Sequence, residues 1–462
     1  MSTFSGLTGA LSALHAQRRA MDVTGQNIAN ANTDGYSRQR VNLEATGGSS
    51  VPAIYSTPNG ANGGVTVTDV TRIQDAFLEA RARIEHGQSA YLAGQQQVYS
   101  RLEQVFKEPS DTGLQKQLSE FWSSWHDLVN RPGDPAARSQ VLATGTTLAN
   151  TIQSSYATLG SLWGTTREQL DGYVTDLNGA AARVAQLNQA IVRNGQAGQP
   201  ANELADQRDL LIMHISELTG ASALARPDGS VDVFLGGSPL VSGASFRQLS
   251  VTGAQRMADQ GASPVQLVWD KPANTPAAVT SGSIAAAMET LSTTLPGIGA
   301  GLDAVTATLA NTVNAQHKLG QDPQGDPGED FFTSTKAVDF AVAITDTNKI
   351  AAAKAGAGPL DSGNADALAA LATAANGADR EYRQFIINLG SAKQTVDRRM
   401  AIQDVVTTDV DSARSAQSGV NLDEEMTNLI SYQRAYQAAS RVMTTVDDML
   451  DTLINRTGLV GR

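Results

Sequence analysis

A seven-residue repeat of apolar side chains constrains the fold of this chain more than any other feature. It runs through residues 135–194, directly after Asp134 and Pro135, a pair typical of a helix start. One seam consists of Leu142, Ala149, Tyr156, Trp163, Leu170, Leu177, Val184 and Ile191, and the other of Ile152, Leu159, Tyr173, Ala180 and Leu187. Helices that wrap around one another have this period, so the repeat predicts a helix roughly 80 Å long. Glycines within it each cost up to ~1 kcal/mol relative to alanine, so the helix needs packed neighbours.

Both ends of the chain also carry helical patterns with an apolar stripe. The stripe in residues 3–31 consists of Phe4, Leu7, Leu11, Leu14, Met21 and Ile28. The C-terminal stripe has one seam of Leu422, Leu429, Tyr436, Met443 and Leu450, and another of Tyr432, Ala439, Val446 and Leu453. Asn421, which is followed by three acidic residues at 423–425, predicts the start of the C-terminal helix. We expect the two terminal helices to pack together and further copies of the chain to cover the rest of the stripes.

The remaining segments predict more helices and one β region. We expect residues 36–68 to be an extended connector, with a short strand at Val65 and Val67. A helix is expected from Asp69, with a cap at Thr71 and Gln74, and it ends near Pro109. Alternating apolar residues between Gly-rich turns predict antiparallel strands within residues 220–282. Helical pattern returns at about 283–317 and over the last hundred residues, with a looser stretch up to about 360 between them.

These elements predict a mainly α fold with a β domain. Both chain termini form a long coiled-coil-like helical bundle, and it carries a small antiparallel β module inserted in the middle. We expect three domains. Residues 1–35 with 418–462 form a terminal coiled-coil assembly domain. Residues 36–219 with 283–320 and 361–417 form a helical rod with the connector, and 220–282 with 321–360 form a mainly β outer domain.

Composition argues against several classes of function. The net charge is −12 and no cluster of Lys or Arg is present, so we expect neither nucleic-acid binding nor a membrane-surface helix. No apolar run approaches the ~20 residues that span a bilayer, and the N-terminus does not resemble a secretory signal peptide. The chain has no cysteine, and its five histidines lie at unrelated spacings. We therefore expect no catalytic residue, no metal site, no cofactor and no enzymatic activity.

Two terminal motifs resemble those of a known family. The first is Asn27-Ile28-Ala29-Asn30-Ala31-Asn32-Thr33-Asp34-Gly35-Tyr36-Ser37-Arg38-Gln39. The second runs from Ser418 through Asn421-Leu422-Asp423-Glu424-Glu425 to Arg441-Val442. Both are similar to the signatures of flagellar axial proteins, most of all to the hook-associated protein 1 family. Shorter similarities at residues 233–243 and 328–332 extend the resemblance from one terminus to the other.

The resemblance implies a structural role in the bacterial flagellum. It implies export through the type III apparatus, ring assembly with other copies at the distal end of the hook, and an extracellular location at the hook–filament junction. The implied partners are the hook protein, the second hook–filament junction protein and an export chaperone on the C-terminal helix. It also implies that Asn27, Ile28, Ala29, Asn30, Thr33, Gly35, Tyr36, Ser37, Arg38 and Gln39 form an N-terminal axial-protein motif. The chain is compact for the family, so the extra outer domain of larger members is expected to be missing.

Two other functions fit parts of the sequence. Another flagellar axial subunit, flagellin or hook protein, would share the helical ends but is expected to differ at Thr33 to Gln39 or at Asn421 to Glu425. A secreted coiled-coil adhesin would use the β module as a binding head, but that class is expected to carry a signal peptide or a membrane anchor.

Overall fold

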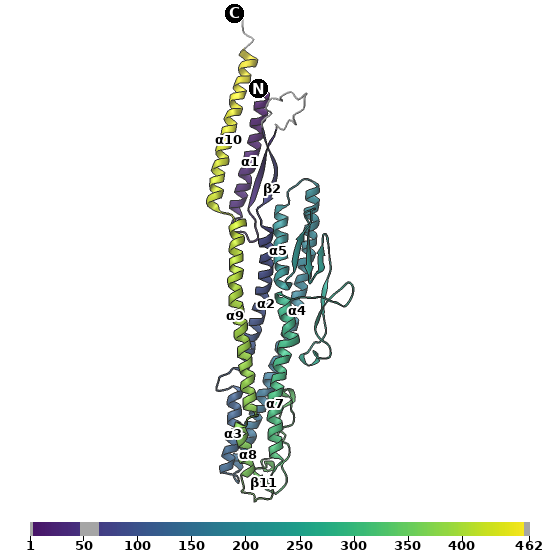
Figure 1. Cartoon of the computed structure of the whole chain (residues 1–462), viewed down its shortest axis with the longest axis vertical. Helices are drawn as coiled ribbons and strands as arrows, with labels where there is room; N and C mark the ends of the chain where they lie inside the picture. The colour runs from purple at the N-terminus through teal and green to yellow at the C-terminus, as the bar shows by residue number, and fades with distance from the viewer. Residues whose placement is uncertain (1–2, 47–63, 457–462) are drawn as a thin grey trace, which may run out of the picture.

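The computed structural model describes residues 3–46 and 64–456, and it describes the side chains of residues 6–46 and 64–454. The chain forms an elongated rod with α1 and α10 side by side at one end (Figure 1). The helices are α1 Thr3–Ala29, α2 Ala76–Phe106, α3 Leu114–Asn130, α4 Pro135–Gln196, α5 Asn202–Thr219, α6 Gly282–Glu289, α7 Leu295–His317, α8 Gly363–Ala370, α9 Ala378–Ser418 and α10 Leu422–Asp451. The strands are β1 Gln39–Thr46, β2 Gly64–Arg72, β3 Ser222–Ala225, β4 Val231–Leu235, β5 Ser238–Ser242, β6 Ser245–Phe246, β7 Leu249–Thr252, β8 Gln266–Trp269, β9 Thr275–Pro276, β10 Gly320–Gln321 and β11 Ala353–Lys354.

Helix α4 is the spine of the rod. Its 62 residues extend about 93 Å, and the Asp134 side chain caps its start by accepting the Ala136 amide at 2.9 Å. Except for Leu187 and Ile191, the side chains of the predicted seams lie in the core or pack against it. Trp163, Leu170 and Leu177 are fully buried. The prediction of one long packed helix over residues 135–194 is therefore confirmed.

Helices α2 and α9 pair in antiparallel directions along the rod. Glu79 and Glu103 lie near the two ends of α2, and they contact Arg414 and Lys393 of α9 in reversed order. Beyond the far end of this pair, α3, α7 and α8 pack together at the end of the rod (Figure 1). Aromatic side chains of α3 pack there against Phe331 and Phe332. In that group, the ring centroids of Phe332 and Phe340 lie 4.5 Å apart. The chain thus runs out along one helix and returns along another, as a hairpin of the whole polypeptide would.

The β module consists of two small antiparallel sheets beside α4. One sheet has the strand order β3-β4-β5-β6 and the other β7-β8-β9. Val231, Val233 and Leu235 of β4 are buried and pack into the same core as α4. The mainly α fold with a small antiparallel β module, which the sequence predicts, is confirmed.

The connector after α1 differs from the expectation. Instead of one short strand, β1 and β2 form an antiparallel hairpin whose register runs from Gln39 opposite Arg72 to Thr46 opposite Gly64. The helix expected from Asp69 with a cap at Thr71 and Gln74 is also wrong, because β2 continues to Arg72. Helix α2 begins at Ala76, and Asp75 caps it by accepting the Phe77 amide at 2.8 Å. The β-branched residues of 65–71 favour a strand, and an aspartate satisfies the free amides of a first turn.

Two further segments depart from what the patterns predict. Helix α3 is not predicted by any heptad, although Phe121, Trp122 and Trp125 are buried on one face of it. Residues 321–360, expected within a mainly β outer domain, contribute Gln321 of β10, the short strand β11, two isolated β-bridges and turns of 3-10 helix. The β10–β11 pair is separate from the sheets of the β module, and β11 packs against α8.

The hydrophobic core does not extend over the whole rod. Among the described residues, the continuous core begins with Val98 and ends with Leu389, and it contains no side chain of α1 or α10. Those two helices pack on each other, and α1 also packs on the β1–β2 hairpin. We call α1 and α10 the terminal pair. Its stability depends on these contacts and not on the core of the rod.

Replacing one exposed glycine of α4 provides a test of the helical assignment. A methyl group at Gly172 would have no atom within 4 Å, so Gly172→Ala should raise the free energy of unfolding by about 1 kcal/mol. Gly94→Ala is the matched control, because its methyl carbon would lie 2.7 Å from Ala286 Cβ, and it should destabilise the chain. Urea denaturation monitored by circular dichroism measures both. A stabilising effect of Gly94→Ala, or a destabilising effect of Gly172→Ala, would contradict this packing.

Candidate assembly site

The first signature motif forms the end of α1 and the loop that follows it. The helix ends at Ala29, and the chain turns through residues 30–35. The Tyr36 amide donates to Thr33 O at 3.1 Å, and Gly35 has a φ of 77°, which favours glycine. This tight reversal brings Tyr36, Ser37 and Arg38 back beside α1 and towards the base of α10.

Asn27 is the centre of the hydrogen bonds in this loop. It is 1 % exposed, and both its amide nitrogen and its amide oxygen are used twice. Nδ2 donates to Gln39 O at 2.9 Å and to Glu425 Oε2 at 3.0 Å. Oδ1 accepts the Tyr36 hydroxyl at 2.8 Å and the Gln39 amide at 3.0 Å. Because both donors and both acceptors are satisfied, this asparagine fixes the loop against α1 and against α10.

Arg38 connects the two signature motifs. Its guanidinium lies 2.7 Å from Glu425 Oε1 and 2.8 Å from Glu424 Oε2. Its amide donates to Ser418 O, the last residue of α9, at 3.0 Å. Asn421 caps α10 by accepting the amides of residues 423 and 424, so both glutamates lie in the first turns, where the helix dipole favours negative charge. We call Asn27, Arg38 and Glu425 the base clamp.

The other side of the loop is held by α5 and β2. The Ser37 amide donates to Asp206 Oδ2 at 3.3 Å, and Asp206 also pairs with Arg72 at 2.9 Å. Gln39 Oε1 accepts from Asn202 Nδ2 at 3.1 Å. Burial, and then the nearby carboxylates of Asp206, Glu203 and Glu425, raise the pKa of Tyr36 to about 12. The hydroxyl therefore stays protonated and remains a hydrogen-bond donor to Asn27.

The loop lies between two surface cavities. One, of about 370 Å³, is lined by Gln26, Tyr36, Glu203 and Leu210 among others. The other, of about 500 Å³, lies on the side of Met213, Arg414 and Val420. Within the ranges that the structure describes, no group of three or more His, Cys, Asp or Glu residues is arranged to hold a metal ion. No described helix has the length and hydropathy needed to cross a bilayer.

The predicted stripes meet along the terminal pair, but they are only partly covered. On α1 the most deeply buried apolar side chains are the small Ala16 and Ala20, while Leu7, Leu14 and Met21 are half-buried and Leu11 is 46 % exposed. On α10, Leu422 and Tyr436 are exposed, and Leu453 just beyond its end is exposed too. The half-buried residues of α10 are Leu429, Tyr432, Ala439, Met443, Val446 and Leu450. The side chain of Phe4 lies outside the described residues. A methyl group at Gly6 would lie 3.9 Å from Val446 Cγ2, so the two helices approach closely.

The predicted residues of the N-terminal motif lie close together in the structure and fall into two groups. Asn27, Tyr36, Ser37, Arg38 and Gln39 all take part in the network described above. Ile28, Ala29, Asn30, Thr33 and Gly35 shape the helix end and the turn instead. Sequence reasoning did not select Glu425, Asp206, Arg72 or Asn202 as site residues. For Glu425 a signal exists, since it follows a helix cap within the second motif; for the other three the local sequence offers none.

Removing the charge of Glu425 tests the base clamp. Glu425→Gln leaves the Arg38 guanidinium without its buried charged partner. The free energy that holds the loop closed should fall by about 3 kcal/mol, so amide exchange at Arg38 and Gln39 should become roughly 100-fold faster. Glu424→Gln is the matched control, because Glu424 is 58 % exposed on its side chain and should contribute less than about 1 kcal/mol. Hydrogen exchange measured by mass spectrometry compares the two variants. Equal effects would show that the buried carboxylate has no special part in closing the terminal pair.

Comparisons with known proteins agree with both motifs and with the rod between them. Residues 99–332 match the model of the flagellar hook-associated protein FlgK helical domain. Residues 7–36 match flagella basal body rod protein, and residues 412–456 match the C-terminal region of flagellar basal body rod FlgEFG protein. These last two matches cover the helices that the base clamp joins.

The chain as a whole is also similar to known proteins and to one solved structure. Flagellar hook-associated protein 1 of Bacillus subtilis is 31% identical, and the alignment covers 100% of each chain. The protein of the same name from Escherichia coli is 25% identical over 97% of this chain and 99% of its own. The structure of the flagellar hook junction protein FlgK from Burkholderia pseudomallei has the same fold, with a TM-score of 0.66 at 16% identity over 73% of this chain and 100% of that chain. The chain therefore belongs to the flagellar hook-associated protein 1 family, which consists of structural proteins of the bacterial flagellum.

Proposed function

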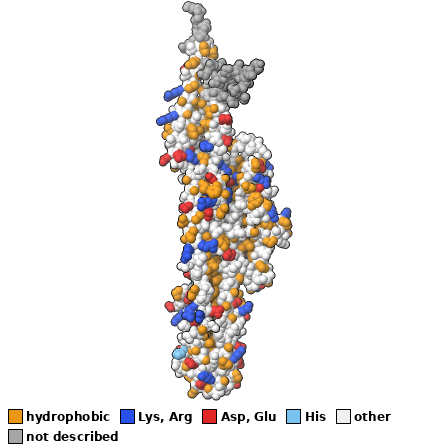
Figure 2. Space-filling view, viewed as in Figure 1, with side chains coloured by type: hydrophobic (Ala, Val, Ile, Leu, Met, Phe, Trp, Pro, Cys, Tyr) orange, Lys and Arg blue, Asp and Glu red, His pale blue; other side chains and the backbone are white. Residues whose placement is uncertain are grey.

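We propose that this chain assembles at the distal end of the hook and forms the hook–filament junction on which the filament is built. The observation that carries the proposal is the surface of α10. Among the described side chains of this 30-residue helix, the buried one is Glu425, a charged residue. Met426, Val442 and Met449 are about half exposed, as are Leu422, Ile430 and Leu453. Hydrophobic side chains are visible along the terminal pair in Figure 2.

Such a helix is only partly stabilised by its own chain. α1 is covered on one side by α10 and on another by the β1–β2 hairpin, whereas α10 packs mainly on α1. Full burial of each exposed Leu, Ile, Val or Met would contribute ~1.5–3 kcal/mol before the loss of conformational entropy is deducted. These contacts become available in an assembly, so we infer that neighbouring subunits cover the outer side of α10.

The position of the exposed residues supports a second copy of the chain as that neighbour. At 3.6 residues per turn, Leu422 and Met426 lie on one flank of the face that meets α1, and Ile430 lies on the outer side next to them. Val442 and Met449 lie on the opposite flank. One copy can therefore place the flank of Leu422 and Met426 against the flank of Val442 and Met449 on the next copy. Contacts between two different patches repeat from copy to copy, and they form a ring when the rotation between copies closes.

The site residues receive roles within this proposal. The base clamp of Asn27, Arg38 and Glu425 sets the direction of α10 relative to α1. The stripe residues on both helices form the contact that closes the terminal pair. We also propose that residues 1–35 with 418–462 act as the assembly domain, and that the segments between them form the rod and the outer module. Among the described residues, the continuous core contains no side chain of α1 or α10, which supports treating the two terminal segments as a separate unit.

The partners and the location follow from the same proposal. The hook protein would lie on one side of the ring, and the second junction protein would lie on the other. The uncovered face of α10 suits an export chaperone before assembly, and type III export would deliver the chain to its extracellular place on the flagellum.

We further propose that the chain is not an enzyme. In support, both ring nitrogens of the buried His317 bind backbone groups, at Glu329 and Ala351.

Deletion of the gene in its host tests the role directly. We expect hooks without filaments, and flagellin released into the medium, because the filament then lacks a surface on which to begin. Electron microscopy of the cells and immunoblotting of the medium measure the two effects. The control is a strain that carries the gene on a plasmid. Filaments of normal number and length on the deletion strain would refute the proposed role.

A charge on the uncovered flank of α10 tests the assembly contact. Ile430→Asp should leave the monomer folded, because Ile430 is 45% exposed. It should reduce the number of filaments per cell at least about tenfold. The reason is that burial of one apolar side chain in the contact contributes about 1.5–3 kcal/mol. Leu319→Asp is the matched control; this leucine is 66% exposed at the other end of the rod, and the filament number should not change. Circular dichroism of both purified variants checks folding. An equal loss with Leu319→Asp would argue against the flank of α10 as the contact.

A further inference from the structure

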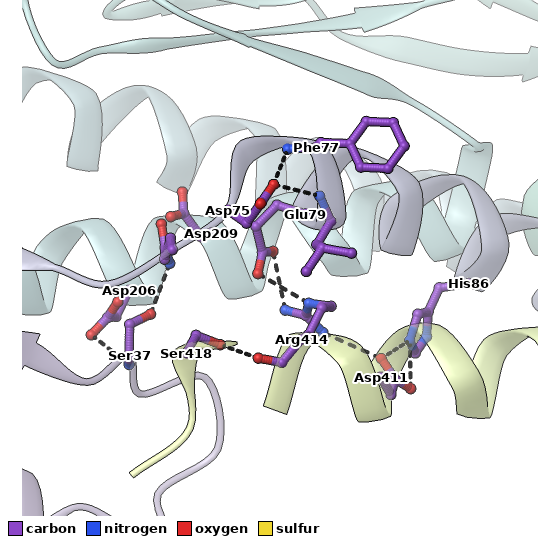
Figure 3. A network of polar contacts seen from close by, with 12 residues as sticks. Ser37, Asp75, Phe77, Glu79, His86, Asp206, Asp209, Asp411, Arg414 and Ser418 are labelled. Atoms are coloured by element: carbon purple, nitrogen blue, oxygen red, sulfur yellow. Dashed lines mark hydrogen bonds and ion pairs between the residues drawn. The ribbon is translucent and has the colours of Figure 1, made fainter. Parts of the chain in front are cut away.

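A histidine on α2 bridges two other helices beside the point where α9 ends. His86 Nε2 lies 3.0 Å and 3.1 Å from the two carboxylate oxygens of Asp411 on α9. Its Nδ1 lies 3.3 Å from Glu217 Oε1 on α5. The labelled side chains of Figure 3 show His86 directed at Asp411, with Arg414 on the same side of α9. One imidazole ring thus holds three helices at once.

This geometry depends on the proton count of the ring. A neutral imidazole has one N–H donor and one lone pair, so it can donate to only one of the two carboxylates, and its lone pair then faces the other. The imidazolium has two donors and satisfies both. The structure therefore fits the protonated ring, and loss of one proton must weaken either the α5 contact or the α9 contact.

The surrounding charges favour the protonated ring. The hydrogen bond to Glu217 raises the pKa of His86 above its ordinary value of 6.5; burial acts against this, and Asp411 adds to it. The same contact with His86 lowers the pKa of Glu217. His214 of α5 also faces Glu217, at 3.8 Å, and its other ring nitrogen lies 3.6 Å from Asp176 of α4. On α9, Arg414 lies 3.4 Å from Asp411.

The contact lies where it can influence the terminal pair. Asp411 is two turns before Ser418, the last residue of α9, and α10 begins just beyond it at Leu422. Ser418 donates its hydroxyl to Arg414 O at 2.8 Å, and its carbonyl accepts the Arg38 amide. Arg414 pairs with Glu79 of α2 at 3.0 Å. The last turns of α9 are therefore held by α2 through two contacts, and only one of them titrates near neutral pH.

We propose that His86, Glu217 and Asp411 form a pH-sensitive latch, which fixes the direction in which α9 passes into α10 while the ring is protonated. A group whose pKa is raised by folding contributes its full stabilisation below the unfolded value of 6.5 and loses it as the pH rises through the higher folded value. The latch is thus closed at acid pH, and it opens as the pH rises through the raised folded pKa of His86. The Arg414–Glu79 pair persists, so α9 loosens without unfolding. The latch is a property of the single chain and does not rest on the proposed function.

Distance measurements between two spin labels test the latch in the full chain. The sequence has no cysteine, so Gln186→Cys on α4 and Gln437→Cys on α10, both exposed, give one defined pair. The distance is measured by pulsed electron paramagnetic resonance at about pH 5.5 and about pH 8.5, two values that lie on either side of the ordinary imidazole pKa. We expect a narrow distance distribution at the lower pH and a broader one at the higher pH. Equal widths at both values would overturn the proposal.

Two variants assign the effect to His86. His86→Gln should give the broad distribution at both pH values, since a glutamine side chain cannot carry the charge that holds two carboxylates. His214→Gln, the matched control, should keep the pH response. An unchanged pH response in His86→Gln would assign the switch to another group and overturn the proposal. In addition, the nuclear magnetic resonance titration of His86 should move to lower pH in Glu217→Gln and in Asp411→Asn, and an unmoved titration would contradict the bridging geometry.

Discussion

A carboxylate buried at the base of α10 connects the two ends of this polypeptide. Glu425 is almost wholly removed from solvent, which is costly for a charged group unless its partners are fixed in place. The Arg38 guanidinium and the Asn27 amide supply those partners from the opposite terminus. The direction of α10, the course of the loop after α1 and the position of the β1–β2 hairpin all follow from this contact. Without it, the half-buried apolar residues of the terminal pair would fix no single register.

Much of the rod could be predicted from local patterns. The heptads of residues 135–194 determine α4, because side chains such as Trp163 and Leu170 need one continuous face to bury. The Asn421 cap and the Asp134-Pro135 pair identify helix starts through the free amides of a first turn. The alternation at Val231, Val233 and Leu235 likewise determines β4. In each case the information lies within a few residues of the element that it specifies.

The rest depends on contacts between distant residues. Residues 39–46 pair with residues 64–72, and neither segment alternates strongly enough to predict a partner. Helix α3 carries its aromatic residues in a cluster that becomes meaningful only once Phe331 packs against Phe121 and Trp125. The ends of the base clamp are separated by 398 residues. Resemblance identified both motifs, but no periodicity indicates that Arg38 and Glu425 form a pair, or that His86 lies between two carboxylates.

The separation of the base clamp along the chain has a kinetic consequence. Helices α2 to α9 share a core whose contacts join residues closer together in the sequence. The base clamp forms only when residues near both ends of the chain are present. Closing so long a loop carries an entropic cost that local contacts do not, so contacts of this kind form late. A polypeptide that emerges from a narrow passage with its N-terminus first would fold its middle before its last helix is released. Helix α10, the proposed contact with neighbouring subunits, would then be the last part of the molecule to become ordered.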